Sequence, residues 1–150
     1  MKKLVSITIF ITALAIFCLS AQAQTNPESV VANLYKAAQT KNVAEMSKVE
    51  LKKYFDQALA NAIWKAANNE DGLNFDILYN AQDTQIKNFR ISKATPQTST
   101  VSNWSVNFTN FGKKERVNFK LSFAKGTGWK ISEITYKDDS TLTGILSSEN

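Results

Sequence analysis

The most regular pattern in the chain is Arg116-Val117-Asn118-Phe119-Lys120-Leu121-Ser122-Phe123-Ala124. Its apolar side chains recur at every second residue, and polar side chains occupy most of the positions between them. Successive side chains of a β-strand point to opposite faces, so one face would hold Val117, Phe119, Leu121 and Phe123. A strand that is apolar on one face is typical of an antiparallel sheet that covers a hydrophobic core. We therefore predict a strand over residues 116–124 with these four side chains in the core.

Three further segments carry related strand patterns. They cover residues 86–94, 101–109 and 129–136. The second segment places three large apolar side chains on one face, namely Trp104, Val106 and Phe108. Turn-forming residues such as Pro96, Asn110 and Gly126 separate the segments. The spacing predicts hairpins that join into an antiparallel sheet of three to four or more strands.

The last strand changes phase along its length. Trp129 and Ile131 share one face, whereas Ile134 and Tyr136 fall in the other phase. A slip of one residue near Ser132-Glu133 is what a β-bulge produces, and a bulge bends the strand that contains it. We therefore expect a strongly curved sheet, with Trp104 and Trp129 in its core.

The front half of the chain has helical periodicity instead. Asn26-Pro27-Glu28 is a helix start, and the apolar spacing after it predicts a helix to about Thr40. A short helical turn is expected over residues 43–47, and a second long helix over 50–68. Residues 73–84 follow neither period but are too apolar for a free loop, so they should pack across an open face.

Residues 142–146 complete this picture. Leu142, Ile145 and Leu146 lie at helical spacing and predict a short terminal turn. The whole pattern predicts an α+β fold in which N-terminal helices pack on a curved antiparallel sheet.

The N-terminal residues have the order of a secretory signal peptide. Met1-Lys2-Lys3 precedes an apolar run over residues 4–19, and Ser20-Ala21-Gln22-Ala23-Gln24 supplies a small-x-small cleavage site. The run is short for a transmembrane anchor, which needs about 20 apolar residues. We predict cleavage between Ala23 and Gln24, residues 1–23 as signal peptide, and a periplasmic or secreted protein. Cys18 follows the bulky Phe17, which disfavours lipidation, so we expect no stable membrane anchor after cleavage.

The predicted mature chain, residues 24–150, has the length of one domain. It contains no cysteine and no histidine, which removes disulfides, thiolate metal sites and imidazole bases from consideration. Loss of Lys2 and Lys3 lowers the formal net charge from +5 to +3. That charge is too small and too scattered for a nucleic-acid partner, and no metal-ligand spacing or cofactor motif occurs.

Five short segments together resemble one bacterial family. They are Val30-Val31-Ala32-Asn33-Leu34-Tyr35, Leu51-Lys52-Lys53-Tyr54-Phe55, Ala81-Gln82-Asp83, Gly128-Trp129-Lys130-Ile131 and the late Leu142. The chain is similar in these segments to the YbjP/YqhG-type envelope domains of unknown function, whose fold is similar to the nuclear transport factor two superfamily. The resemblance implies helices cradled by a cone-shaped sheet with a pocket on its concave face. It implies no activity.

Pocket residues can be sought among the large aromatic and acidic side chains. The candidate ligand-binding residues are Tyr35, Trp64, Tyr79, Asp83 and Glu133. Asp83, Asp76 or Glu133 would be the carboxylate base if the pocket were catalytic, with tyrosines as donors. No paired-carboxylate or nucleophile motif supports catalysis, however.

Three functions therefore stay open. The first is a non-enzymatic exported binding module for a small apolar ligand or an envelope protein. The second is a pocket enzyme with a carboxylate base. The third is an immunity or inhibitor protein against a secreted effector.

Overall fold

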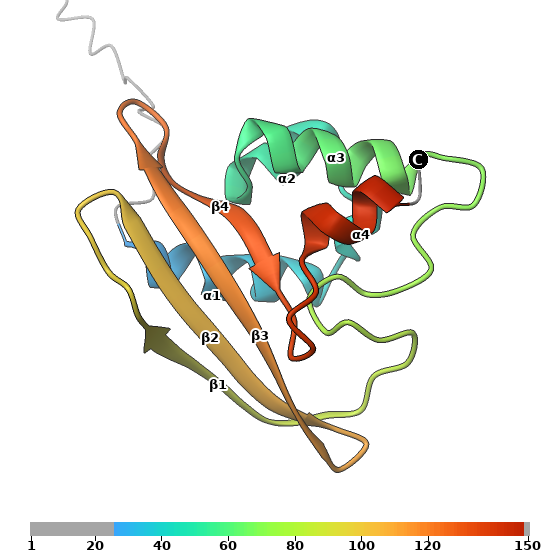
Figure 1. Ribbon diagram of the computed structural model, residues 1–150. Coiled ribbons are helices and arrows are strands. Elements are labelled where there is room, and N and C mark those ends of the chain that lie inside the picture. The colour runs from blue at the N-terminus through green and yellow to red at the C-terminus, as the bar shows by residue number, and fades with distance from the viewer. Residues whose placement is uncertain (1–25, 149–150) are drawn as a thin grey trace, which may run out of the picture.

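The computed structural model describes residues 26–148 (Figure 1). The predicted signal peptide, its cleavage site at Ala23 and Gln24, and Cys18 lie outside the described residues. The helices are α1 (Pro27–Ala38), the short 3₁₀ helix η1 (Val43–Glu45), α2 (Lys48–Tyr54), α3 (Gln57–Ala67) and α4 (Leu142–Ser148). The strands are β1 (Ile86–Ala94), β2 (Val101–Asn110), β3 (Lys113–Ala124) and β4 (Gly128–Thr135). The predicted α+β fold class is confirmed.

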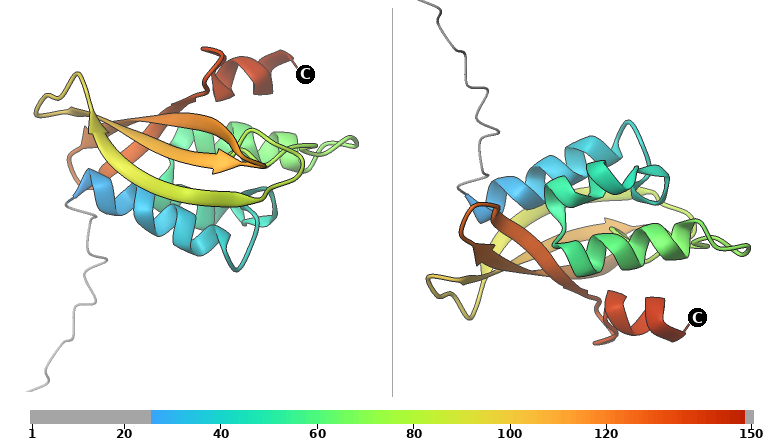
Figure 2. Two further views of the ribbon diagram at one scale, coloured as in Figure 1. Left: turned by 90° about the horizontal axis from the view of Figure 1, so that it is seen from below. Right: turned by 90° about the horizontal axis from the view of Figure 1, so that it is seen from above.

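The four strands form one antiparallel sheet in the order β1-β2-β3-β4. In the centre of the sheet Trp104 lies opposite Phe119, and Val106 lies opposite Val117. These residues point toward the helices, and all four are buried. Helices α1 and α3 cover this concave face, as the two views in Figure 2 show. The core lies between the helices and the sheet.

Strand β4 contains the predicted bulge. Lys120 of β3 pairs with Glu133, and the next residue, Leu121, pairs with Ile131. Ser132 is therefore the extra residue, which lets Ile131 and Ile134 both enter the core although they differ in phase. The slip predicted near Ser132-Glu133 is confirmed, and the sheet curves around the helices.

One side chain of the central strand departs from the prediction. Val117, Phe119 and Leu121 are buried, but Phe123 is 43% exposed. It lies near the β3–β4 turn, where its ring packs edge to face on Trp129 with centroids 5.4 Å apart. The prediction was wrong for Phe123 because periodicity shows which face a residue takes but not how far the core extends.

The two strand tryptophans differ in burial. Trp104 is 8% exposed, and its indole N–H donates to Ser102 Oγ over 2.9 Å, so this tryptophan lies in the core as predicted. Trp129 is only partly buried and packs at the border of the core.

The second long helix is two helices. Helix α2 ends at Tyr54, and α3 begins at Gln57. Between them Phe55 is extended and forms a parallel bridge with Ile131, and the Asp56 N–H donates to the Ile131 carbonyl over 2.9 Å. The Asp56 side chain then caps α3 by accepting from Leu59 N over 2.8 Å. The prediction of a single helix over 50–68 was thus wrong. Phe55 and Asp56, in the middle of that range, pair with Ile131 of β4 through their backbones and interrupt the helix.

The remaining segments behave as expected. In the irregular segment 73–84, Ile77 and Leu78 are buried in the core. Leu142 and Leu146 bury one side of α4, which packs on α3 and β4. Within residues 26–148, no helix combines the length and the hydrophobicity that crossing a membrane requires.

Candidate functional site

A tight loop over residues 76–81 forms one wall of the site. The Asp76 N–H donates to the Ala81 carbonyl over 2.8 Å, and the Asp76 carboxylate accepts from Leu78 N over 2.8 Å. Asn80 has a φ of 50°, a left-handed conformation that asparagine tolerates better than most residues. Asp76 therefore shapes this loop through its own backbone contacts.

Two buried tyrosines fix the loop to the rest of the fold. Tyr35 of α1 donates its hydroxyl to the Leu78 carbonyl over 2.8 Å. Tyr136, just after β4, donates to the Ile77 carbonyl over 3.0 Å. Burial raises the pKa of both hydroxyls, so both remain protonated donors. The protons of these hydroxyls are used to satisfy buried carbonyls.

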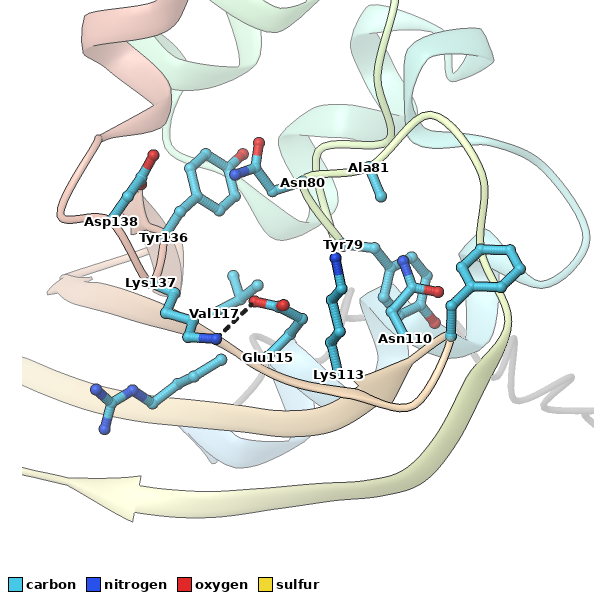
Figure 3. A pocket seen from close by; sticks show the side chains of 12 residues that line it. Tyr79, Asn80, Ala81, Asn110, Lys113, Glu115, Val117, Tyr136, Lys137 and Asp138 are labelled. Atoms are coloured by element: carbon cyan, nitrogen blue, oxygen red, sulfur yellow. Dashed lines mark ion pairs between the residues drawn. The ribbon is translucent and has the colours of Figure 1, made fainter.

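A cavity of about 560 Å³ lies beside this loop (Figure 3). The loop, the β2–β3 hairpin and the end of β4 border it, and it is open to solvent on one side. Its lining residues are Tyr79, Asn80, Ala81, Asn110, Phe111, Lys113, Glu115, Arg116, Val117, Tyr136, Lys137 and Asp138. The cavity therefore lies at the end of the sheet that carries the β2–β3 hairpin, and its walls are aromatic, apolar and charged.

The charged groups of the cavity are unequally engaged. Lys137 Nζ lies 3.5 Å from Glu115 Oε2 and donates to the Lys114 carbonyl. Asp138 accepts from the backbone and side chain of Ser140, which lowers the pKa of its carboxyl. Lys113 forms no ion pair within residues 26–148, and Figure 3 shows it extending from β3 toward the loop. The ammonium of Lys113 is thus the free charge on the concave side of this site.

Tyr79 separates this cavity from a second hollow. Its ring packs edge to face on Phe108 and Tyr35, with centroids 5.2 and 5.5 Å away. Burial, followed by the charge of Asp76, raises the pKa of its hydroxyl. The second hollow, of about 380 Å³, lies between α1 and β1 and is lined by Ala32, Tyr35, Lys36, Gln39, Tyr79, Ile86, Phe89 and Ile91.

The structure brings two of the five predicted site residues together. Tyr35 and Tyr79 lie in ring contact, and both line the α1–β1 hollow. Trp64 lies on α3, 39% exposed, with the Lys48 ammonium 5.1 Å from its ring centroid. It lines neither of the two hollows.

The two predicted acidic residues also lie elsewhere. Asp83 is exposed, and its carbonyl accepts from Asn110 Nδ2 over 3.2 Å. The Glu133 carboxylate accepts from both the N–H and the hydroxyl of Thr143, at the start of α4. Glu133 therefore joins β4 to α4. Neither carboxylate faces the 560 Å³ cavity.

Sequence reasoning did not select Lys113 as a site residue. It lies in the cluster Lys113-Lys114-Glu115-Arg116, which has the composition of a solvated turn. The sequence did contain one indication. Lys113 and Glu115 precede Val117 by four and two residues, so all three side chains lie on the concave side of β3. No group of three or more potential metal ligands occurs within residues 26–148.

Comparison with known proteins identifies no family for the chain. No family model matches the chain, and no curated protein matches it. Among solved structures, the chain is similar to the phospholipid-binding protein from Ralstonia solanacearum in complex with a phospholipid. The two are 12% identical, the alignment covers 83% of this chain and 70% of that chain, and the TM-score is 0.39. A likeness of this TM-score assigns neither a fold family nor a ligand to the chain.

Proposed function

We propose that this chain is an exported, non-enzymatic binding module that holds a small amphipathic anion in the 560 Å³ cavity. The observation that carries the proposal is an apolar and aromatic wall beside the ammonium of Lys113, which forms no ion pair within residues 26–148. Arg116 also lines the cavity without an ion pair, but its position in β3 is out of phase with Lys113. The volume lies in the range of small-molecule sites, about 300–1,000 Å³. The apolar body of the ligand would lie against the accessible apolar lining residues Tyr79, Ala81 and Phe111, and its anionic end would meet Lys113.

The walls of the cavity suit binding because they are already fixed. Tyr136 is held by its bond to the Ile77 carbonyl, and Tyr79 is held between two aromatic rings. Groups that need no rearrangement lose less conformational entropy when a ligand binds. A preformed cavity therefore supports a ligand that is recognised mainly by shape and by one charge.

The arrangement of carboxylates favours binding over catalysis. Asp76, Asp83 and Glu133 do not line the cavity. Glu115 does line the cavity, but it lies 3.5 Å from Lys137 Nζ. A general base needs a carboxylate within reach of the substrate proton. The carboxylates of this cavity are engaged in contacts of their own.

The proposal can be tested with dodecanoate and its neutral counterpart, dodecanol, by isothermal titration. We expect dodecanoate to bind more tightly, and Lys113→Gln to weaken it about 10- to 100-fold, since a hydrogen bond to a charged group contributes about 1.5–3 kcal/mol. Lys125→Gln is the matched control, because Lys125 is exposed in the β3–β4 turn and does not line the cavity. Asp83→Asn should also bind dodecanoate normally.

Two results would contradict the proposal. One is equal affinity for the acid and the alcohol, and the other is dodecanoate binding that survives Lys113→Gln unchanged. An additional variant, Ala81→Trp, places a large side chain in the cavity and should abolish binding of both ligands. Circular dichroism of each variant confirms that the fold is retained.

A further inference from the structure

Charge is distributed unevenly between the helical segment, residues 26–85, and the segment that forms most of the sheet, residues 86–130. Between residues 86 and 130 there are nine basic residues and one acidic residue, Glu115. Between residues 26 and 85 there are eight acidic and six basic residues. Residues 86–130 contain β1, β2, β3 and the start of β4, whereas residues 26–85 contain α1 to α3. The sheet is therefore strongly basic, and the helical side is slightly acidic.

Strand register places most of the basic residues of the sheet on one face. Asn107 of β2 lies opposite both Arg90 and Arg116, and Thr109 lies opposite both Lys87 and Lys114. These positions are out of phase with the core residues Val106 and Phe108, so they point away from the helices. We name this side the outer face. Its cations are Lys87, Arg90, Lys114, Arg116 and Lys120, all of them exposed.

The middle of the outer face is polar. Ser105 donates to Asn118 Oδ1 over 2.7 Å, and Asn107 donates to Ser92 Oγ over 3.4 Å. Among the described residues of β1 to β3, the aromatic side chains lie in phase with the core or, like Phe89, against Tyr35 of α1. The outer face thus consists of short, mutually bonded polar groups with long cationic side chains around them.

The cations of the outer face are not neutralised by neighbours. The ion pairs of residues 26–148 are Lys41–Glu50 and Lys137–Glu115, and neither includes one of the five cations. Glu133 lies opposite Lys120 in the register, but its carboxylate accepts from Thr143. Glu115 lies on the opposite, concave side of β3. The face therefore carries five exposed cations without ion pairs, and Glu133, opposite Lys120 in the register, is the acidic residue at its β4 side.

We propose that the outer face docks on an anionic lipid surface. Protein interfaces have a core of aromatic and apolar anchors, and β1 to β3 present none on this face. Anionic headgroups require only cations near the surface, and each basic residue contributes about 1 kcal/mol. The acidic helical side turns away from the same surface, so the charge distribution also orients the molecule.

Vesicle co-sedimentation tests this inference on the protein recovered from an expression host. Vesicles containing phosphatidylglycerol should bind the protein, and pure phosphatidylcholine vesicles should not. The variant Arg90→Gln/Lys120→Gln should lose about thirtyfold in affinity for the anionic vesicles. The matched control, Lys52→Gln/Lys65→Gln, removes the same charge from exposed positions on α2 and α3 and should retain most of the binding.

Several outcomes would overturn the inference. They are equal binding to neutral vesicles, equal loss in the two double variants, and binding of a soluble acidic protein in place of the anionic vesicles. Added salt should weaken vesicle binding, because exposed charges are screened. Arg90 and Lys120 line neither the cavity nor the α1–β1 hollow, so dodecanoate binding should be unchanged in that variant. The two proposals can thus fail separately.

Discussion

At the scale of single residues, buried hydroxyl groups hold the wall of the candidate site. Tyr35 and Tyr136 each donate to a carbonyl of the loop that carries Tyr79. A buried carbonyl without a hydrogen-bond donor lowers the free energy of unfolding, and packing of an aromatic ring against it does not compensate for the lost hydrogen bond. The position of Tyr79 therefore depends on two groups that do not themselves touch the ligand.

Replacing Tyr136 with phenylalanine tests this dependence. Tyr136→Phe keeps the ring but leaves the Ile77 carbonyl without its donor, so we expect a loss of about 1–3 kcal/mol in the free energy of unfolding. Urea denaturation measures the loss. Tyr54→Phe is the control, since none of the hydrogen bonds described involves the Tyr54 hydroxyl. A loss of equal size in both variants would show that the hydroxyl of Tyr136 contributes nothing specific.

At the scale of elements, the short helix α2 depends on its first turn. Ser47 and Glu50 form a capping box, in which each side chain accepts from the other residue's backbone N–H. Lys41 also donates to the Glu50 carboxylate over 2.8 Å. The hydrogen bond from Lys41, followed by those from Ser47, lowers the pKa of Glu50 to about 2.

The lowered pKa of Glu50 predicts a pH-dependent contribution to stability. Because the folded state holds this carboxylate ionised, its contribution is present above pH 4.5 and is lost as the pH falls toward about 2. Glu50→Gln should therefore reduce the acid-side slope of the unfolding free energy between those values. Urea titrations at several pH values measure it. Glu45→Gln, a nearby exposed control, should keep the wild-type slope.

The elements also show how far the sequence could predict the fold. The strands were predictable because alternation over nine residues fits a half-buried strand and does not fit a helix, and even the bulge at Ser132 left a phase change in the pattern. The break at Phe55-Asp56 was not predictable from the local sequence, since phenylalanine and aspartate are both common in helices. Only Ile131, far along the chain, holds these two residues extended. Tyr35 is buried and Tyr79 half-buried, as large aromatic residues in apolar segments suggest, whereas Asp83 and Glu133 have partners that no local pattern reveals.

At the scale of the whole molecule, one core joins the helices to the sheet. Phe119 is fully buried within it, while Phe123 on the same face of β3 is 43% exposed. We expect Phe119→Ala to cost about 3–5 kcal/mol in unfolding free energy. Phe123→Ala should cost far less, because the Phe123 side chain buries less apolar surface in the folded state.

The same pair of variants tests whether residues 26–148 unfold as one unit. Tryptophan fluorescence reports on Trp104 and Trp129 in the sheet and Trp64 on α3, and far-ultraviolet circular dichroism reports mainly on the helices. Coincident transitions by both probes are expected for Phe119→Ala and for the unmodified chain. Separate transitions would mean that the helices and the sheet unfold independently.

The bridge between Phe55 and Ile131 has a consequence for self-association. It occupies part of the β4 border from within the chain, and Thr135 pairs there with Thr141. Among residues 26–148, the other edge strand, β1, has no such bridge. We therefore expect a second copy to add a strand at β1 more readily than at β4. The contact that interrupts the helix thus also covers part of a sheet edge.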